Sequence, residues 1–206
     1  LSFTGSVPVG QLIQAAAARN TIPVTLELGG KSPQVVFADA DLEAALPFLV
    51  NAGIQNCGQT CSAASRILVE RPVFDQVVAR MADRYRAFRV GPAMDDLDIG
   101  PVISARQQEI VQGYLAVARD TGLRIAGQAM LPANLPPGGC YVAPTLLAPA
   151  APDHRLAREE IFGPVQVVIP FDGEAEALAI ANGTDYGLVA GVWTRDGGRQ
   201  LRMARK

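Results

Sequence analysis

Short apolar runs of strand length alternate with longer stretches of helical spacing along most of the chain. Residues 33–37 and 66–69 are rich in Val, Ile and Leu, and residues 41–54 between them place apolar side chains on one side of a helix. Strands separated by helices of this length pair in parallel, because each helix carries the chain back across the sheet. We therefore predict an α/β fold with a mainly parallel sheet flanked by helices.

The same alternation extends to both ends of the chain. Ser6 and Pro8 are typical of the first turn of a helix, and this helix is expected to continue to Arg19. Residues 131–139 contain three prolines and two glycines and are expected to form a loop. Further strands are predicted at residues 1–4, 23–28, 142–147, 165–169 and 188–193, and further helices at residues 73–88, 104–119, 174–181 and from 197 or 198 onward.

Composition excludes several classes of partner and location. A formal net charge of -2 over 206 residues argues against nucleic acid, because no basic stripe is available to neutralise phosphates. Three cysteines form an odd count without paired spacing, so we expect a reducing, cytoplasmic location. The most apolar stretch, residues 42–54, contains Glu43 and Pro47 and is too short to span a membrane. No signal peptide is visible.

The two ends of the sequence suggest an excised piece of a longer protein. The chain begins at Leu1, inside a predicted strand, and stops at Lys206, inside a predicted charged helix. We therefore expect further sequence on both sides of it.

Cys61 is the first candidate for chemistry, because it lies in a Gly-rich turn between a helix and a strand. One interpretation is a buried small hydrophobic residue, the usual fate of a free cysteine. The polar neighbours of Cys61 and its position at a sheet edge, where ligands collect in α/β folds, favour a nucleophile instead. A thiol is mostly protonated at neutral pH, so a nucleophile requires a base or a lowered pKa.

Two further interpretations of the sulfur chemistry use His154, the single histidine. A Cys–His hydrolase would pair it with Cys61, but residues 151–155 are polar and typical of a solvated loop. A zinc site would combine Cys57, Cys61, Cys140 and His154. Structural zinc sites usually use two tight pairs, whereas Cys140 and His154 are widely spaced, so we expect no metal.

Glu27 is the second candidate, because it interrupts the apolar run of residues 24–28. It is either an outward-facing charge or a general base whose pKa is raised in a partly apolar pocket. Gly29 and Gly30, which follow it, suit a backbone that approaches a ligand closely. Residues 5–10 could set a helix N-terminus against a phosphate, but they match neither a Walker loop nor a dinucleotide fingerprint.

Seven short motifs together make the sequence recognisable. They occur at residues 3–6 (FTGS), 26–33 (LELGGKSP), 56–61 (NCGQTC), 100–103 (GPVI), 141–146 (YVAPTL), 159–165 (EEIFGPV) and 186–188 (YGL). In this order they resemble the aldehyde dehydrogenase superfamily along essentially the whole chain. The resemblance implies an oxidoreductase that converts an aldehyde to a carboxylic acid with NAD or NADP.

The resemblance also implies roles for single residues. Cys61 matches the thiol that attacks the aldehyde to give a thiohemiacetal and then a thioester. Glu27 matches the base that activates water to release the acid, and its presence favours hydrolysis over transfer of the acyl group to coenzyme A. Cys57 and Cys140 match no catalytic position and are expected to be packing residues.

Five positions match cofactor contacts of the family. Gly5 and Ser6 match the turn near the pyrophosphate, and the backbone of Leu28 matches a contact to the nicotinamide amide. Glu160 matches the acid that holds the nicotinamide ribose, and Phe162 matches an aromatic side chain beside the ring.

By the same resemblance, residues 1–29 are the C-terminal tail of a nucleotide-binding domain, and residues 30–206 are a catalytic domain truncated at its C-terminus. An asparagine that completes the family's oxyanion hole lies outside this chain. We therefore expect a homo-oligomer in the full-length protein and an isolated chain that does not oxidise aldehydes at a useful rate. A cofactor-independent thiol esterase or a non-catalytic homologue is the alternative.

Overall fold

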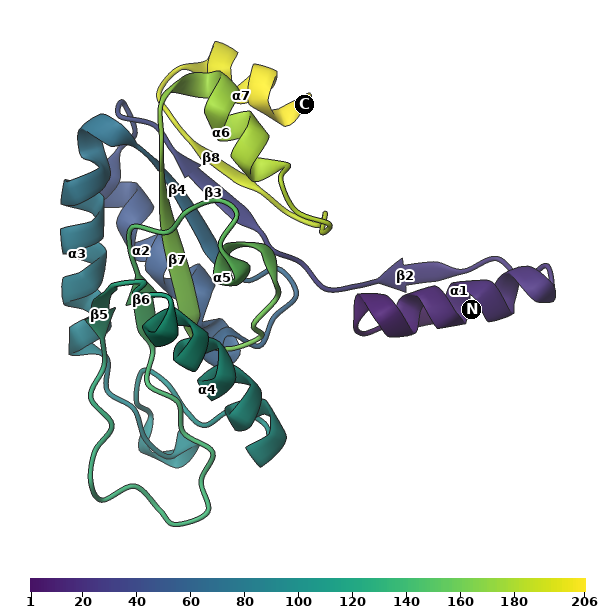
Figure 1. The fold of residues 1–206 in the computed structure, drawn as a ribbon, viewed down its shortest axis with the longest axis horizontal. Coiled ribbons are helices and arrows are strands. Elements are labelled where there is room, and N and C mark those ends of the chain that lie inside the picture. Colours follow the sequence, from purple (N-terminus) through teal and green to yellow (C-terminus); the bar gives the residue numbers. More distant parts are fainter.

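The computed structural model describes residues 1–206, and its body is built on one six-stranded sheet (Figure 1). All neighbouring strands run parallel except β5 and β6, which are antiparallel. This confirms the predicted α/β class with a mainly parallel sheet. In sheet order the strands are β5 (Ile125–Gln128), β6 (Thr145–Leu147), β7 (Val165–Phe171), β4 (Arg66–Glu70), β3 (Pro33–Val36) and β8 (Gly191–Trp193).

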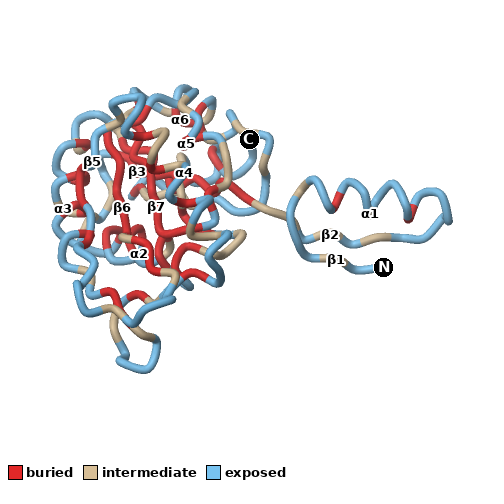
Figure 2. Tube along the Cα trace, turned by 60° about the horizontal axis from the view of Figure 1, so that its bottom comes forward, coloured by how far each residue is buried: buried red, intermediate tan, exposed pale blue.

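Helices cover both faces of this sheet. Helices α2 and α3 pack against each other and against the strands on one face, and α6 contacts β3 and β4. The central strands are buried along almost their whole length, as expected for parallel strands covered on both sides (Figure 2). The helices of the body are α2 (Leu42–Ile54), α3 (Phe74–Ala87), α4 (Ala105–Asp120), α5 (Arg155–Arg158), α6 (Gly173–Ala181) and α7 (Gly197–Ala204).

Two polar side chains inside the sheet tie the layers together. Gln166 of β7 donates to the carbonyl oxygens of Leu49 and Ala64 and accepts a 2.6 Å hydrogen bond from the Tyr85 hydroxyl. Arg66 of β4 is equally buried, and its guanidinium donates to three carbonyl oxygens. These bonds compensate the cost of burying an amide and a cation among apolar side chains.

The N-terminal residues form an arm that projects from the body (Figures 1 and 2). It consists of β1 (Ser2–Thr4), α1 (Val7–Arg19) and β2 (Thr25–Glu27), and its two strands make a separate parallel pair. Only Gly10 and Ala17 of α1 are buried, and Leu12 is 71% exposed. The assignment of residues 1–29 to a nucleotide-binding domain stays a prediction.

Several predicted elements differ from the observed ones in extent. Strand β6 begins at Thr145 instead of residue 142, and β8 begins at Gly191 instead of residue 188. The last helix ends at Ala204, before the end of the chain. Strand β5 and helix α5 were not predicted. None of the helices combines the length and the apolar character that crossing a bilayer requires.

Candidate active site

Cys61 lies in a tight turn that leaves α2 and enters β4. Asn56, Cys57 and Gly58 have φ values of 50°, 57° and 71°, all in the left-handed region. This conformation costs about 1–2 kcal/mol for a non-glycine residue, so the surrounding structure must hold it. The Asn56 side chain donates to the Gln59 carbonyl at 3.1 Å, and the Gln59 side chain donates back to the Asn56 carbonyl at 3.0 Å.

The turn is packed against the segment that carries Glu160 and Phe162. A Cβ atom at Gly58 would overlap the carbonyl group of Gly163, so only glycine permits this approach. The Glu160 segment and the Cys61 turn therefore lie side by side. A cavity of about 10 Å³ separates them and is lined by residues that include Gly30, Thr60 and Glu160.

The dipeptide Gly29–Gly30 joins both parts of this site. The Gly30 N–H donates to Glu160 Oε1 at 3.2 Å, and a Cβ atom at Gly29 would overlap the Glu160 carboxylate. A Cβ atom at Gly30 would overlap the carbonyl oxygen of Cys61. One short stretch of backbone therefore touches the thiol turn and the acid at once, which explains the glycine pair that the sequence shows after Glu27.

The three cysteines have different environments. Cys57 is buried, its thiol lies 3.4 Å from the Gly100 carbonyl oxygen to which it donates, and burial raises its pKa to about 12. Cys140 is half-buried and contacts the core, as expected for a packing residue. Cys61 is half-buried and free. The N–H of Cys61 takes no part in the backbone hydrogen bonds of the turn.

Charged groups cluster behind Glu160. Burial raises the pKa of Glu160, while the Gly30 N–H and the Lys31 ammonium act in the opposite direction. Lys31 is 2% exposed and its Nζ has no hydrogen-bond partner. Burial, helped by the nearby Arg66, lowers the pKa of Lys31 to about 7. The carboxylates of Glu159 and Glu160 favour the charged form of this lysine.

Phe162 is 39% exposed and has a φ of 55°, which is unusual for an aromatic residue. Gln107, in the first turn of α4, donates to the carbonyl oxygens of Ile161 at 3.1 Å and Phe162 at 2.8 Å. These two bonds hold the strained segment and leave the aromatic ring at the surface.

The arm carries the remaining predicted residues. Glu27 ends β2 with an exposed side chain, and its carbonyl oxygen accepts a 3.0 Å hydrogen bond from the Gly5 N–H. Ser6 occupies the N-cap position of α1 without a side-chain capping bond. The Leu28 side chain packs against Gly10. The arm thus gathers Gly5, Ser6, Glu27 and Leu28 in one place.

Glu27 and Cys61 make no direct side-chain hydrogen bond. Glu27 is three residues before Gly30, so the Cα atoms of these two residues are at most about 11 Å apart by chain length alone. Gly30 lies against the Cys61 carbonyl oxygen, but none of the main cavities is lined by both Glu27 and Cys61, so their joint action stays a prediction.

The site lies at the amino-terminal ends of the parallel strands. Cys61, Gly30 and Gly163 precede β4, β3 and β7 respectively. Cys61 thus lies at an end of the sheet, but before the interior strand β4 and at its amino end, whereas ligands of open α/β sheets usually collect at the carboxyl ends. A helix-to-strand connection must lie at the amino end of its strand, so that general rule does not support a site here.

The two alternatives that use His154 are wrong. His154 caps α5 through Nδ1, which accepts the Leu156 N–H at 3.1 Å, and its Nε2 lies 2.9 Å from the Thr121 hydroxyl. Both ring nitrogens are therefore engaged away from Cys61. No group of three or more metal-binding side chains comes together, so Cys57, Cys61, Cys140 and His154 do not form a zinc site.

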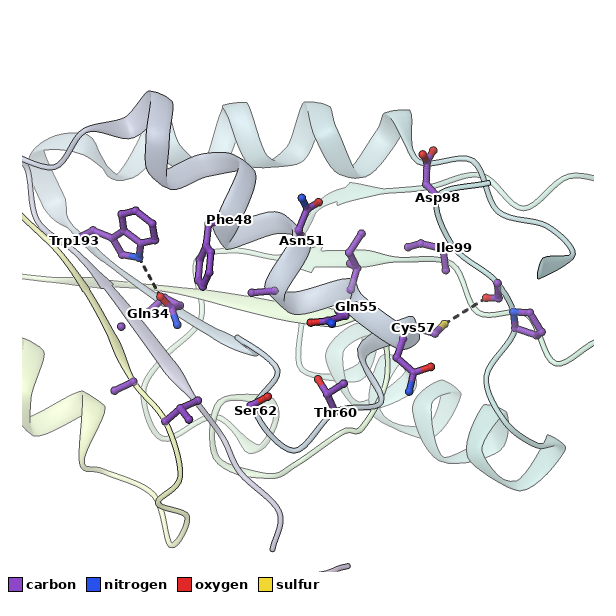
Figure 3. Close-up of a pocket in the computed structure, with 18 of the residues that line it drawn as sticks. Gln34, Phe48, Asn51, Gln55, Cys57, Thr60, Ser62, Asp98, Ile99 and Trp193 are labelled. Carbon is purple, nitrogen blue, oxygen red and sulfur yellow. Dashed lines mark hydrogen bonds between the residues drawn. The ribbon is translucent and has the colours of Figure 1, made fainter. Parts of the chain in front are cut away.

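A groove of about 1100 Å³ opens beside the thiol turn and runs along α2 to β8 (Figure 3). Thr60 and Ser62, the neighbours of Cys61, line one part of it. Phe48 and Trp193 lie at its other end, where the Trp193 indole donates to Gln34 Oε1 at 3.0 Å. Cys61 and Glu160 themselves do not line this groove.

Three residues near the site were missed from the sequence. Gln59 and Gln107 are surface-type residues in sequence, and only the fold shows that their amides hold backbone carbonyls. Lys31 stands in a recognised motif, and its position directly after two glycines and before a buried strand was a signal of burial.

The whole chain matches a known protein family. The model of the family described as "Aldehyde dehydrogenase family" matches residues 1–206. A betaine aldehyde dehydrogenase of Cereibacter sphaeroides is 44% identical over 206 residues, covering 98% of this chain and 42% of that protein. Betaine aldehyde dehydrogenase 1 of Rhizobium meliloti is 41% identical over 205 residues, with 99% and 42% covered. The chain thus spans less than half the length of these curated relatives.

Solved structures show the same fold. A candidate aldehyde dehydrogenase from Burkholderia cenocepacia superimposes with a TM-score of 0.97 at 56% identity, covering 99% of this chain and 43% of that one. An aldehyde dehydrogenase from Bacillus cereus in complex with NAD+ gives a TM-score of 0.92 at 37% identity, covering 99% and 41%.

Proposed function

Because the chain belongs to the aldehyde dehydrogenase family, we propose that it supplies the thiol-bearing part of an enzyme that oxidises an aldehyde to a carboxylic acid with NAD or NADP. The observation that carries this proposal is the double contact of Gly30. The Gly30 N–H donates a hydrogen bond to Glu160, and the Gly30 Cα lies against the Cys61 carbonyl oxygen. Glu27 is three residues earlier in the same backbone segment. A nucleophile, a base and a ribose-binding acid are thereby linked through four consecutive residues.

Each residue has one chemical task in this proposal. The Cys61 thiolate attacks the aldehyde carbon and forms a C–S bond, which leaves negative charge on the oxygen. The free N–H of Cys61 is available to that oxygen. After oxidation the carbon is a thioester on Cys61. Glu27 then takes a proton from water, the water oxygen attacks the thioester carbon, and sulfur leaves as the carboxylic acid is released.

The residues assigned to the cofactor fit a dinucleotide. The first turn of α1 carries no acidic residue and Ser6 leaves it uncapped, so its N–H groups are available to a pyrophosphate. Glu160 offers carboxylate oxygens to ribose hydroxyls, and Phe162 offers an exposed aromatic side chain. NAD or NADP, when bound, supplies the acceptor for the hydride that leaves the aldehyde carbon. The solved Bacillus cereus relative, itself an NAD+ complex, supports this assignment.

We further propose that residues 1–29 belong to a nucleotide-binding domain and that the 206-residue chain alone does not oxidise aldehydes at a useful rate. The resemblance implies that the asparagine of the oxyanion hole is not among residues 1–206, and loss of one such donor costs about 10²–10³ in rate. The 206-residue chain is therefore expected to produce no NADH from aliphatic or aromatic aldehydes. Measurable NADH formation by the chain alone would refute this part of the proposal.

Cys61→Ala tests the nucleophile in the complete gene product that carries this chain. It is expected to abolish aldehyde-dependent NADH or NADPH formation, because no thioester can form. Cys140→Ala is the matched control, since Cys140 is half-buried but lies outside the site, and it is expected to retain activity. Retained oxidation in Cys61→Ala would contradict the proposal.

A thiol esterase is the second candidate, because the thiol turn and the adjoining groove are complete within residues 30–206. It predicts hydrolysis of 4-nitrophenyl acetate without cofactor, with loss of this activity in Cys61→Ala. Repeated turnover by the chain alone would favour this reaction, whereas a single acetylation of Cys61 would not.

A further inference from the structure

The Cys61 turn is tied to a distant loop by a single side chain. Gln59 Oε1 accepts a hydrogen bond from the Ile103 N–H at 2.9 Å, across 44 positions of sequence. The Gln59 backbone N–H and side-chain Nε2 both donate to the Asn56 carbonyl, at 3.1 Å and 3.0 Å. The Gln59 amide therefore closes the left-handed turn at one end and attaches it to residues 100–104 at the other.

This loop has a fixed position of its own. The Val102 N–H donates to the Cys140 carbonyl at 2.9 Å, and Ser104 caps α4 by accepting the Gln107 N–H. Gln107 in turn holds the carbonyls of Ile161 and Phe162. The segment at the start of α4 is therefore hydrogen-bonded to Gln59 through the Ile103 N–H and to the Phe162 segment through the Gln107 side chain.

We propose that Gln59 is a positioning residue, which sets the direction of Cys61 by fixing the turn against the start of α4. The proposal rests on the assignment of Cys61 as the nucleophile. Gln59 precedes Cys61 by two residues, and between them only Thr60 can adjust the path of the chain. Attack on a carbonyl requires a defined angle and a nearby donor for the oxyanion, so a small change of direction is costly.

Two reactions of Cys61 distinguish the orientation of its thiol from the accessibility of its thiol. In acetylation by 4-nitrophenyl acetate the thiolate attacks the ester carbonyl and 4-nitrophenolate leaves, so the backbone must be correctly placed. In alkylation by iodoacetamide the thiolate displaces iodide, which requires only access. Both rates are measured on the 206-residue chain by peptide mass spectrometry at Cys61, with Cys140 as the internal reference.

Gln59→Met keeps the length of the side chain and removes both of its hydrogen bonds. We expect acetylation of Cys61 to slow by about tenfold or more, with alkylation unchanged within about twofold. Gln59→Glu keeps an oxygen for the Ile103 N–H and should recover part of the acetylation rate. Gln108→Met is the matched control, because Gln108 donates to the Tyr141 carbonyl at 2.8 Å without touching the turn, and it should change neither rate.

Each contrary result has one meaning. The positioning role would be overturned by any of three results for the rate of Cys61 acetylation. These are a wild-type rate in Gln59→Met, an equal reduction in Gln59→Met and Gln108→Met, or a rate in Gln59→Glu no higher than in Gln59→Met. A loss of acetylation with a matching rise in alkylation at Cys57 would show unfolding and would also overturn it. If wild-type Cys61 is acetylated no faster than Cys140, the nucleophile assignment fails first and the inference fails with it.

Discussion

Lys31 shows how a single buried charge couples the site to pH. Its amine is buried without a hydrogen-bond partner, in a chain whose other lysine, Lys206, is exposed. Burying a cation in this way is unfavourable unless the group loses its proton. In sequence, Lys31 lies between the glycine pair of the site and the buried strand β3 of the core.

The pKa of Lys31 is about 7 in the folded chain against 10.5 for a free lysine. Between these values the unfolded chain binds more protons than the folded one, so folding stability rises with pH across this window. Below about pH 7 the destabilisation by Lys31 stays at its full value and no longer changes with pH. We predict that Lys31→Met raises the free energy of unfolding by about 1–3 kcal/mol near pH 6 and by much less near pH 10. The loss of a cation beside Glu160 offsets part of the gain.

Urea unfolding of wild type and Lys31→Met at several pH values measures this difference. Lys206→Met is the matched control and is expected to leave the pH dependence unchanged. An equal effect of Lys31→Met at both ends of the pH range would contradict a buried, titrating amine.

The residue scale also shows what sequence could and could not predict about the site. Cys61, Glu27 and Glu160 stand in recognisable motifs, so their candidacy followed from sequence; their roles remain predictions. Gln59 stands in the same motif as Cys61, but its bonding role could not be predicted, because its partner Ile103 is 44 positions away and only the fold brings the two together. Long-range side-chain bonds of this kind leave no local pattern.

At the scale of elements, Gln166 connects β7 to both helices on one face. Its amide donates to the carbonyl oxygens of Leu49 in α2 and Ala64, and it accepts a hydrogen bond from the Tyr85 hydroxyl of α3. A Cβ atom at Gly53 of α2 would overlap this amide, so the glycine leaves the space that the amide occupies. Strand and helices are thereby fixed relative to one another in the layer beneath the thiol turn.

Gln166→Met is expected to lower the free energy of unfolding by about 2–4 kcal/mol, because the buried Tyr85 hydroxyl and the carbonyls of Leu49 and Ala64 lose their hydrogen bonds to Gln166. Chemical denaturation measures the change. Gln112→Met, an exposed position of α4, is the matched control and should alter stability by less than about 0.5 kcal/mol. A Gln166→Met variant as stable as the control would show that the interior tolerates the unpaired groups.

Elements with a periodic or β-branched pattern were predictable, including several three-residue strands, whereas β5 and α5, which lack such a pattern, were not. Helices α2, α3 and α4 and strands β3, β4 and β7 follow directly from their apolar patterns. Strand β5 has only one β-branched residue, contains a bulge, and lies where Gly127 approaches the backbone of Ala82. Helix α5 is one turn long and depends on the His154 cap. Both elements form because of tertiary contacts, so no local apolar periodicity in the sequence predicts them.

On the scale of the whole molecule, the arm and the body differ in how much they bury. The apolar residues of the body form one large core, whereas α1 of the arm buries only Gly10 and Ala17. A segment with so few buried contacts opens at low cost and exposes its backbone to proteases. The homo-oligomeric state, the absence of nucleic-acid and membrane partners, and the cytoplasmic location stay predictions.

Limited trypsin digestion is expected to cut after Arg19 before Arg119. Both arginines are exposed and lie in the last turn of a helix, but α1 belongs to the arm and α4 buries Val111, Leu115 and Ala118. Timed mass spectrometry of the products gives the order. First cleavage after Arg119 would show that the arm is no less stable than the body.

The glycine pair that joins arm and body is also the pair that touches Glu160 and Cys61. The connection between arm and body and the proposed reaction centre therefore share these two residues. In a saturation library across the chain, position 30 should accept no replacement, even by alanine, because a Cβ atom there meets the Cys61 backbone. Position 29 should be less restricted, because a Cβ atom there meets only the movable carboxylate of Glu160. Gly30 is thus constrained twice, by the backbone of the Cys61 turn and by its hydrogen bond to Glu160.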